Sequence, residues 1–328
     1  MGRMEAGIEA GVQPAEVEEA ARSLSSHLQP TPLQQSRAFT SKAGCAVFLK
    51  IESVQPTRSF KVRGALNKVM RMSAAERAAG VITASAGNHG QGVAYAAAAF
   101  GITATVLVPE NANLLKVEAI KRLGARVVPA GRSYQEAYLE ASRVQAVTGA
   151  TLVHAFDDPD VIAGQGTVAA EILEQLPETD TVLVPVGGGG LLAGMSLYLK
   201  SRRPKIRLVG VEPHGADGLT RSLAAGQQVI LDRVQTMADG LAASGPGRLT
   251  FDLIKSRVDE MIRVGEDEML RGIRLLFEWE HLLAEPSGAA SLAALLYRYT
   301  PEPDEHVVLV LSGGNVTDEV MIRALRTR

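Results

Sequence analysis

The chain has 328 residues, 46% of them hydrophobic, and its 34 basic and 36 acidic residues nearly cancel to a net charge of −2. A chain of this length and composition can bury a full core and can form two lobes or domains. The balanced charge offers no basic surface to nucleic acid or to anionic lipid, so we expect neither partner.

The N-terminal region predicts a helix and no export signal. Residues 14–25 are acidic and rich in alanine, and they lack the apolar run of a signal peptide. The longest uncharged stretch, residues 92–108, is shorter than the roughly 20 residues that a membrane span needs. Gly101 divides it into a helical half and a β-branched half. Cys45 is the only cysteine, which excludes an internal disulfide and a cysteine-based metal site and fits a cytoplasmic location.

Short β-branched segments alternate with segments rich in Ala, Leu and Glu along the chain. The predicted strands are residues 47–51, 81–84, 104–108, 126–129, 181–186, 207–211 and 307–311. This alternation predicts βαβ units, and therefore an α/β fold with a mainly parallel sheet covered by helices on both faces. No flexible linker divides the chain, so we expect any second lobe to be inserted within the first.

Glycine-rich segments follow three of the predicted strands. They are Ala86-Gly87-Asn88-His89-Gly90, Gly187-Gly188-Gly189-Gly190 and Ser312-Gly313-Gly314-Asn315. In open α/β sheets ligands bind beyond the carboxyl ends of the strands, where glycines let backbone N–H groups approach an anion at a helix N-terminus. These segments are therefore the candidate binding loops.

The four consecutive glycines predict a nest of backbone N–H groups for phosphate. They also allow another interpretation, because Gly188, Gly190 and Ala193 satisfy the pattern G-x-G-x-x-[GA] and Glu212 ends the next strand. On that alternative the chain is an NAD-dependent dehydrogenase. A non-enzymatic binding or structural role is a third hypothesis.

The segment Ser59-Phe60-Lys61-Val62-Arg63-Gly64 resembles the cofactor-lysine motif of the fold-type II pyridoxal-phosphate enzymes, in the threonine/serine dehydratase and serine racemase family. The resemblance implies that Lys61 carries pyridoxal 5′-phosphate as a Schiff base and removes the Cα proton of the substrate. That chemistry needs a neutral amine near neutral pH, which we expect burial and the charge of Arg63 to favour. Arg58 stands where many relatives carry glycine.

The other motifs occur in the order of the same family, and the resemblance implies their roles. Asn88 bonds the 3′-oxygen of the cofactor, and Ser312 bonds its pyridine nitrogen. Asp239-Gly240 matches positions near the ring. The implied cofactor site consists of Phe60, Lys61, Asn88, Gly187, Gly188, Gly189, Gly190, Leu191, Glu285, Ser312 and Gly313. The implied substrate-carboxylate site consists of Ser85, Ala86, Gly87, Asn88 and His89.

Two positions favour the dehydratase branch. Ala86 stands where the racemases carry a serine that delivers a proton, and Phe156 stands where they carry an asparagine. The resemblance therefore implies an ammonia-lyase that converts a small 3-hydroxy L-amino acid, threonine or serine, to a 2-oxo acid and ammonia by β-elimination. Serine racemase and hydroxyaspartate dehydratase of the same family are the alternatives.

The resemblance extends from about residue 30 to the C-terminus. It implies two open, twisted, mainly parallel sheets flanked by helices, with a large cofactor domain of residues 1–77 and 157–328 and a small mobile domain of residues 78–156. It also implies a homodimer or homotetramer. The chain ends soon after the Ser312 motif, so we expect no regulatory domain and no feedback by isoleucine.

A divalent cation is a further prediction from the resemblance. Some relatives hold one through a glutamate, a backbone carbonyl and a second acid, and Glu212 and Ala216 match the first two positions. Oxygen ligands suit Mg²⁺ or Ca²⁺. The position of the second acid is Gly218, with Asp217 one residue earlier.

Overall fold

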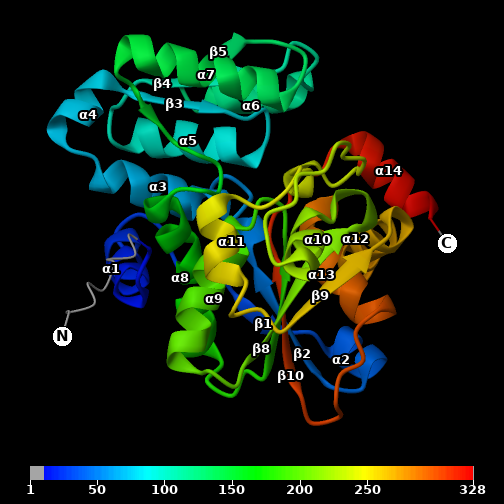
Figure 1. Ribbon diagram of the computed structural model, residues 1–328. Helices are drawn as coiled ribbons and strands as arrows, with labels where there is room; N and C mark the ends of the chain where they lie inside the picture. The colour runs from blue at the N-terminus through cyan, green and yellow to red at the C-terminus, as the bar shows by residue number, and fades with distance from the viewer. Residues whose placement is uncertain (1–10, 328) are drawn as a thin grey trace, which may run out of the picture.

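Two β-sheets flanked by helices make up the protein in a computed structural model that describes residues 11–327 (Figure 1). The strand order is β1-β2-β10-β7-β8-β9 in the large sheet and β5-β4-β3-β6 in the small sheet. All neighbouring strands run parallel except β1, which is antiparallel to β2. The predicted α/β fold with two mainly parallel sheets is confirmed.

All seven strands predicted from the sequence are present. The large sheet contains β1 (Leu33–Gln35), β2 (Ala46–Ile51), β7 (Thr181–Pro185), β8 (Arg207–Pro213), β9 (Glu260–Val264) and β10 (His306–Leu311). The small sheet contains β3 (Val81–Ala84), β4 (Ala104–Val108), β5 (Arg126–Pro129) and β6 (Thr151–Leu152). Sequence patterning missed β1, β6 and β9, because the first two are very short and β9 is an edge strand interrupted by charged residues.

The helices divide between the two sheets. Around the large sheet lie α1 (Pro14–Leu24), α2 (Arg37–Ala43), α8 (Pro159–Gln175), α9 (Gly190–Arg202), α10 (Gly218–Ala225), α11 (Arg248–Ile254), α12 (Glu266–Glu280), α13 (Pro286–Tyr297) and α14 (Asp318–Arg326). Around the small sheet lie α4 (Ala74–Ala79), α5 (Asn88–Ala99), α6 (Leu114–Arg122) and α7 (Tyr134–Thr148). Helix α3 (Lys61–Arg71) lies between the two groups, because it packs against both α8 and α5 and its buried side chains belong to the core of the small sheet. Three short 3₁₀ helices complete the set, η1 (Glu52–Val54), η2 (His214–Ala216) and η3 (Asp239–Leu241).

The large sheet has a hydrophobic core on each face. Along β7, Val182 and Val184 point to the core beneath α8 and α9, whereas Leu183 points to the core beneath α12 and α13. Alternate residues of a strand face opposite sides of a sheet, so a strand buried on both faces reads as one continuous apolar run. This explains why β7 and β10 were recognisable in the sequence.

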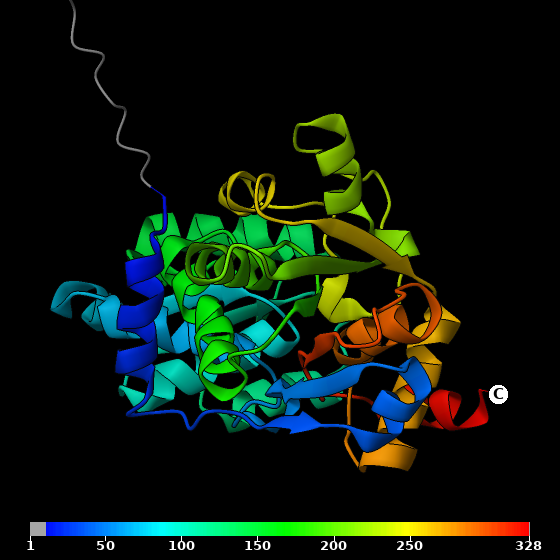
Figure 2. The ribbon, with the colours of Figure 1, turned by 90° about the horizontal axis from the view of Figure 1, so that it is seen from below.

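The small sheet is an insertion into the large one. The chain leaves the large sheet after β2, forms β3 to β6, and returns through α8 to β7 (Figure 1). In both views α1 packs alongside α8 (Figures 1 and 2). The four strands lie inside the predicted small domain, residues 78–156, whose boundaries stay a prediction. Residues 1–10 and 328 of the predicted large domain lie outside the described residues.

Within the described part of the chain, no helix has the length and apolar character needed to cross a bilayer.

The backbone of helix α3, which begins at Lys61, lies in contact with the backbone of α8. A Cβ added at Gly164 would lie 2.7 Å from Gly64 Cα, so only glycine fits at this crossing. A Cβ at Gly92 on α5 would likewise lie 3.1 Å from the backbone carbonyl of Lys61. The first turn of α3 is therefore held between α5 and α8.

A buried cluster of charged side chains also holds helix α3 in place. Arg63 is 1% exposed, and its Nε and Nη2 donate to the two carboxylate oxygens of Glu52, each over 2.8 Å. Its Nη1 and Nη2 also donate to Glu171, over 2.6 and 2.9 Å. Lys50 Nζ donates to the same Glu171 and to Thr31 O, over 2.6 and 2.8 Å. Two cations and two carboxylates thus neutralise one another, and together they join α3 to β2, η1 and α8.

We expect Arg63→Ala to lower the free energy of unfolding by about 3–5 kcal/mol, because it leaves Glu52 buried without its cation. Arg143→Ala is the matched control, since it removes an exposed ion pair with Glu140 and should leave the unfolding midpoint nearly unchanged. Urea denaturation of both variants measures the difference. Equal midpoints for the two variants would contradict a structural role for the cluster.

Candidate active site

Loops that follow the ends of several strands meet beside the N-terminus of α3. Ser59 and Gly313 form an isolated antiparallel bridge, which joins the loop after β2 to the loop after β10. Asn315 Nδ2 donates to Asn88 Oδ1 over 2.7 Å, which adds the loop after β3. The structure therefore brings together segments that the sequence placed at separate strand ends.

Arg58 lies in the tight part of this junction. Its φ of 59° is in the left-handed region that favours glycine. Its carbonyl accepts a hydrogen bond from Gly314 N over 2.8 Å, and its side chain is exposed. The backbone conformation explains why glycine suits this position and why an outward-pointing arginine is tolerated.

Lys61 is the first residue of α3, and its amine points into the site. Lys61 Nζ donates to Ala155 O over 2.7 Å and lies 5.2 Å from the centre of the Phe60 ring. Burial lowers the pKa of Lys61 from 10.5 to about 8. Arg63 was expected to contribute to this shift, but Glu52 and Glu171 neutralise its guanidinium. Removal from water is therefore the cause that the structure supports.

The glycine loop, residues 187–190, links β7 to α9. Gly189 adopts a φ of 93°, and α9 begins at Gly190. A Cβ at Gly188 would lie 2.3 Å from the Phe156 ring, and one at Gly187 would lie 3.1 Å from Gly240 O. The loop is thus enclosed by backbone and by an aromatic ring, with the first N–H groups of a helix at its end. This geometry suits a phosphate. Leu191 follows on α9 and is buried.

Asn88 and Glu285 connect the two sheets across the site. Asn88 Nδ2 donates to Glu285 Oε1 over 2.5 Å. Burial and the charge of Asp239 raise the pKa of Glu285 to about 7. Asp239 in turn forms an ion pair with Lys116 of α6. Asp239 and Glu285, the two acids that the resemblance implies near the cofactor ring, are therefore neighbours in the structure.

Three hydroxyl groups are buried around this junction. Ser312 Oγ donates to Ser287 O over 3.2 Å. Ser59 Oγ and Ser287 Oγ have no hydrogen-bond partner among residues 11–327. A Cβ at Gly313 would lie 2.3 Å from Glu285 Oε1, so a side chain there would displace the Glu285 carboxylate. Buried polar atoms without partners are costly, which indicates that a polar ligand completes the site.

The loop after β3 lines the opposite wall. Ser85, Ala86, Gly87 and Asn88 are half-buried, and Gly87 N donates to Ser85 Oγ over 3.2 Å. The His89 imidazole is 3% exposed, and its Nε2 lies 2.9 Å from Val153 O. This side chain points away from the loop surface and into the small domain.

Glu212 is buried beneath the first turn of α10. Its carboxylate accepts hydrogen bonds from Leu219 N over 2.9 Å and from Thr220 N over 2.8 Å. Asp217 pairs with Arg221 and Arg263. In the region that the structure describes, no three His, Cys, Asp or Glu side chains are grouped for a metal ion. Glu212 also lacks the free carboxylate that the dinucleotide pattern required for a ribose.

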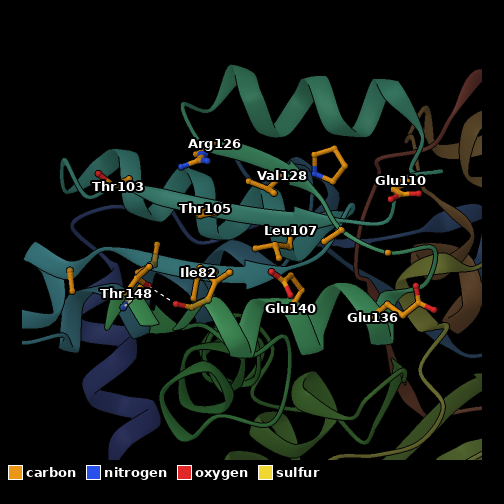
Figure 3. A pocket seen from close by; sticks show the side chains of 17 residues that line it. Ile82, Thr103, Thr105, Leu107, Glu110, Arg126, Val128, Glu136, Glu140 and Thr148 are labelled. Carbon is orange, nitrogen blue, oxygen red and sulfur yellow. Dashed lines mark hydrogen bonds between the residues drawn. The ribbon is translucent and has the colours of Figure 1, made fainter. Parts of the chain in front are cut away.

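A separate pocket of about 630 Å³ lies between the small sheet and α7 (Figure 3). Ile82, Thr105 and Val128 face it from the strands, and Glu136 and Glu140 border it from α7. None of the site residues predicted from the sequence lines this pocket.

Several residues of the site were not predicted. Ala155 acts through its carbonyl, which no residue-type pattern can reveal. Asp157 accepts hydrogen bonds from Arg248 N and Thr250 N, both over 3.1 Å, and so fixes α11 beside the glycine loop. Asn315 belongs to the predicted loop of residues 312–315, and Ser287 lies two residues after Glu285, so closeness in sequence to a predicted site residue was the available signal.

Comparison with known proteins agrees with this geometry. The family model described as pyridoxal-phosphate dependent enzyme matches residues 24–313. The chain is 43% identical to an L-threonine ammonia-lyase of Thermotoga maritima, over 94% of this chain and 77% of that protein. It is 37% identical to a serine racemase of Oryza sativa subsp. indica, over 95% and 93%. The structure of maize serine racemase superposes with a TM-score of 0.92 at 35% identity, covering 96% of this chain and 97% of the other.

Glu285 should make the stability of the cofactor-free protein depend on pH. Its pKa rises from 4.5 to about 7 on folding, so its contribution to stability is complete below pH 4.5 and is lost as the pH rises through 7. Glu285→Gln cannot ionise, and its stability relative to wild type should increase by up to about 3 kcal/mol between pH 5 and pH 8. Thermal unfolding across this range measures it, with the exposed Glu178→Gln as control. A difference independent of pH would contradict the prediction.

Proposed function

Because the chain belongs to the pyridoxal-phosphate dependent enzyme family, we propose that it is an ammonia-lyase that converts threonine or serine to a 2-oxo acid and ammonia. The family resemblance read from the Lys61 motif is confirmed. One observation carries the proposal: a buried amine, Lys61, stands between a glycine loop at a helix N-terminus and a group of buried hydroxyls.

The residues present fit pyridoxal phosphate. The glycine loop and Leu191 would hold its phosphate, Lys61 would bond it covalently beside Phe60, and Ser312 would hold its ring nitrogen. Asn88, Glu285 and Gly313 would lie around the ring. The unpartnered Ser59 and Ser287 hydroxyls support a polar ligand at this point. When bound, the cofactor withdraws electrons from the substrate and makes its Cα proton acidic.

Lys61 would serve as the base. Its pKa of about 8 leaves a useful fraction of neutral amine near neutral pH, and Ala155 O orients Nζ. After the substrate amine has displaced it from the cofactor, Lys61 would take the proton from Cα, the Cβ–O bond would break, and the hydroxyl would leave as water with one proton, which balances the one removed from Cα. The unsaturated product tautomerises and hydrolyses, which gives one 2-oxo acid and one ammonia.

The loop of residues 85–89 would bind the substrate carboxylate. It joins β3 to α5, so the free N–H groups of the first turn of α5 lie beside the Ser85 hydroxyl. Ala86 and Gly87 would contribute backbone only. His89 would also take part through its backbone, since its imidazole is buried against Val153.

Two residues favour elimination over racemisation. Ala86 is half-buried in the carboxylate loop and has no proton to deliver to the substrate. Phe156 packs its ring against the glycine loop and supplies no polar group there. Serine racemase and hydroxyaspartate dehydratase remain the alternatives within the family. The dehydrogenase alternative has lost its support, because Glu212 is occupied by the amides of α10.

We also propose the finer features that the resemblance implies. The small domain, residues 78–156, would close on the substrate, and the ion pair between Lys116 and Asp239, one from each domain, would hold it in the closed position. A homodimer or homotetramer is supported by exposed apolar side chains on the large domain, among them Phe277, Trp279, Leu283, Ile322 and Leu325.

A cytoplasmic location agrees with one buried cysteine. A Mg²⁺ or Ca²⁺ ion at Glu212 and Ala216 stays a prediction, tested by assaying with and without Mg²⁺.

Lys61→Ala should abolish the reaction. We expect release of 2-oxo acid from a panel of 3-hydroxy amino acids to fall by roughly 10³-fold or more. The visible absorption of the cofactor-loaded protein, and its loss on borohydride treatment with covalent labelling of Lys61, should also disappear. Lys42→Ala, at an exposed position, is the control. Wild-type protein that shows no such absorption when supplied with cofactor would refute the proposal.

Ala86→Ser should increase racemisation relative to elimination. The new hydroxyl could deliver a proton to the face of the substrate opposite Lys61, so D-serine should form from L-serine alongside pyruvate. Chiral chromatography of serine, together with assay of the 2-oxo acid, gives the ratio. Wild-type protein that forms mainly D-serine would instead establish the racemase alternative.

A further inference from the structure

The His89 side chain forms one hydrogen bond, and its partner is a backbone carbonyl. His89 Nε2 lies 2.9 Å from Val153 O, and a carbonyl can only accept, so Nε2 carries the proton. Thr83 Oγ1 donates to the same carbonyl over 2.8 Å. Val153 is fully buried, so these two side chains, one from β3 and one from α5, fix its peptide from the interior of the small domain.

The imidazole has no further donor for a substrate. Its Nδ1 is buried without a partner among the described residues, and as the unprotonated nitrogen it can only accept. Burial and the nearby charge of Lys61 lower the pKa of His89 to about 3, so the ring stays neutral at working pH. A substrate carboxylate would meet a lone pair there rather than a cation.

Val153 immediately precedes the turn that holds Lys61. His154 Nδ1 accepts hydrogen bonds from Phe156 N over 3.2 Å and from Asp157 N over 2.8 Å, which closes the turn. Within it, Ala155 O points at Lys61 Nζ over 2.7 Å. The turn also places the Phe156 ring against the glycine loop.

We propose that His89 is a positioning residue, which acts through the carbonyl of Val153 to set Ala155 O against Lys61 and Phe156 against the glycine loop. This inference rests on the proposed function, since Lys61 is the base there. It gives the imidazole a role in the orientation of that base. Binding of the carboxylate belongs to the backbone of the loop.

Two substitutions at His89 separate these roles. His89→Gln keeps an N–H donor at about the reach of Nε2, whereas His89→Leu has a similar volume and no donor. Thr83→Val removes the other hydrogen bond to Val153 O from a side chain that is 1% exposed. The substrate probe is L-alanine, which has the carboxylate but no β-hydroxyl, and its binding to the cofactor-loaded protein is followed by absorbance.

We expect His89→Leu to lower kcat by roughly 10- to 100-fold, because small displacements of a catalytic group are costly. The Kd of L-alanine should stay within about threefold, and His89→Gln should restore most of kcat. Thr83→Val should lower kcat in the same sense, so the proposal can be tested even if His89→Leu does not fold. The absorption maximum of the loaded protein should shift in His89→Leu and return in His89→Gln.

Two results would overturn the proposal. The first is a loss of L-alanine binding of tenfold or more in both His89 variants with kcat retained, which would make the imidazole a carboxylate ligand. The second is an unchanged kcat in His89→Leu and Thr83→Val. Failure of the proposed function is distinguishable, because wild-type protein would then release no 2-oxo acid while the absorption differences between the variants persist.

Discussion

The position of Arg63 between two buried carboxylates is the constraint on which the site depends. Glu52 comes from the end of β2 and Glu171 from α8, so one guanidinium ties the start of α3 to the sheet and to the helix that returns from the small domain. An arginine suits this place because its planar fork satisfies two carboxylates at once. Because these ion pairs fix α3, they also fix the position of its first residue, Lys61, relative to the glycine loop.

The charge balance of that cluster matters as much as its geometry. A neutral network leaves no nearby counter-ion for the Lys61 amine, and burial alone lowers its pKa. Glu285 shows the opposite effect of burial on an acid, whose pKa rises. By excluding water, the site therefore brings the pKa of a base, Lys61, and the pKa of an acid, Glu285, closer to neutral pH. Loops from both sheets line the site, so any movement between the sheets would change that exclusion.

Sequence patterning predicted the strands buried on both faces and the family motifs, because each of these has a local signature. It could not predict Ala155, whose carbonyl holds Lys61, since any residue type can supply that atom. It assigned Arg63 an electrostatic effect on Lys61, which the structure corrects because two distant glutamates neutralise the arginine. It identified Glu212 as a candidate metal ligand, and the fold places that carboxylate against the first amides of α10, so a metal ion there stays a prediction. Local motifs identify reactive side chains, but only tertiary contacts decide their charge and their partners.

The central place of β10 in the large sheet has a consequence for synthesis of the protein. This strand lies between β2 and β7, so the sheet cannot be completed until residues 306–311 have been synthesised and have left the ribosome. Pairing over so long a separation is slow, and the unpaired edges of β2 and β7 would be exposed during that time. The loop after β10 carries Ser312, so the proposed ligand of the cofactor ring nitrogen would reach its place only after that strand has paired.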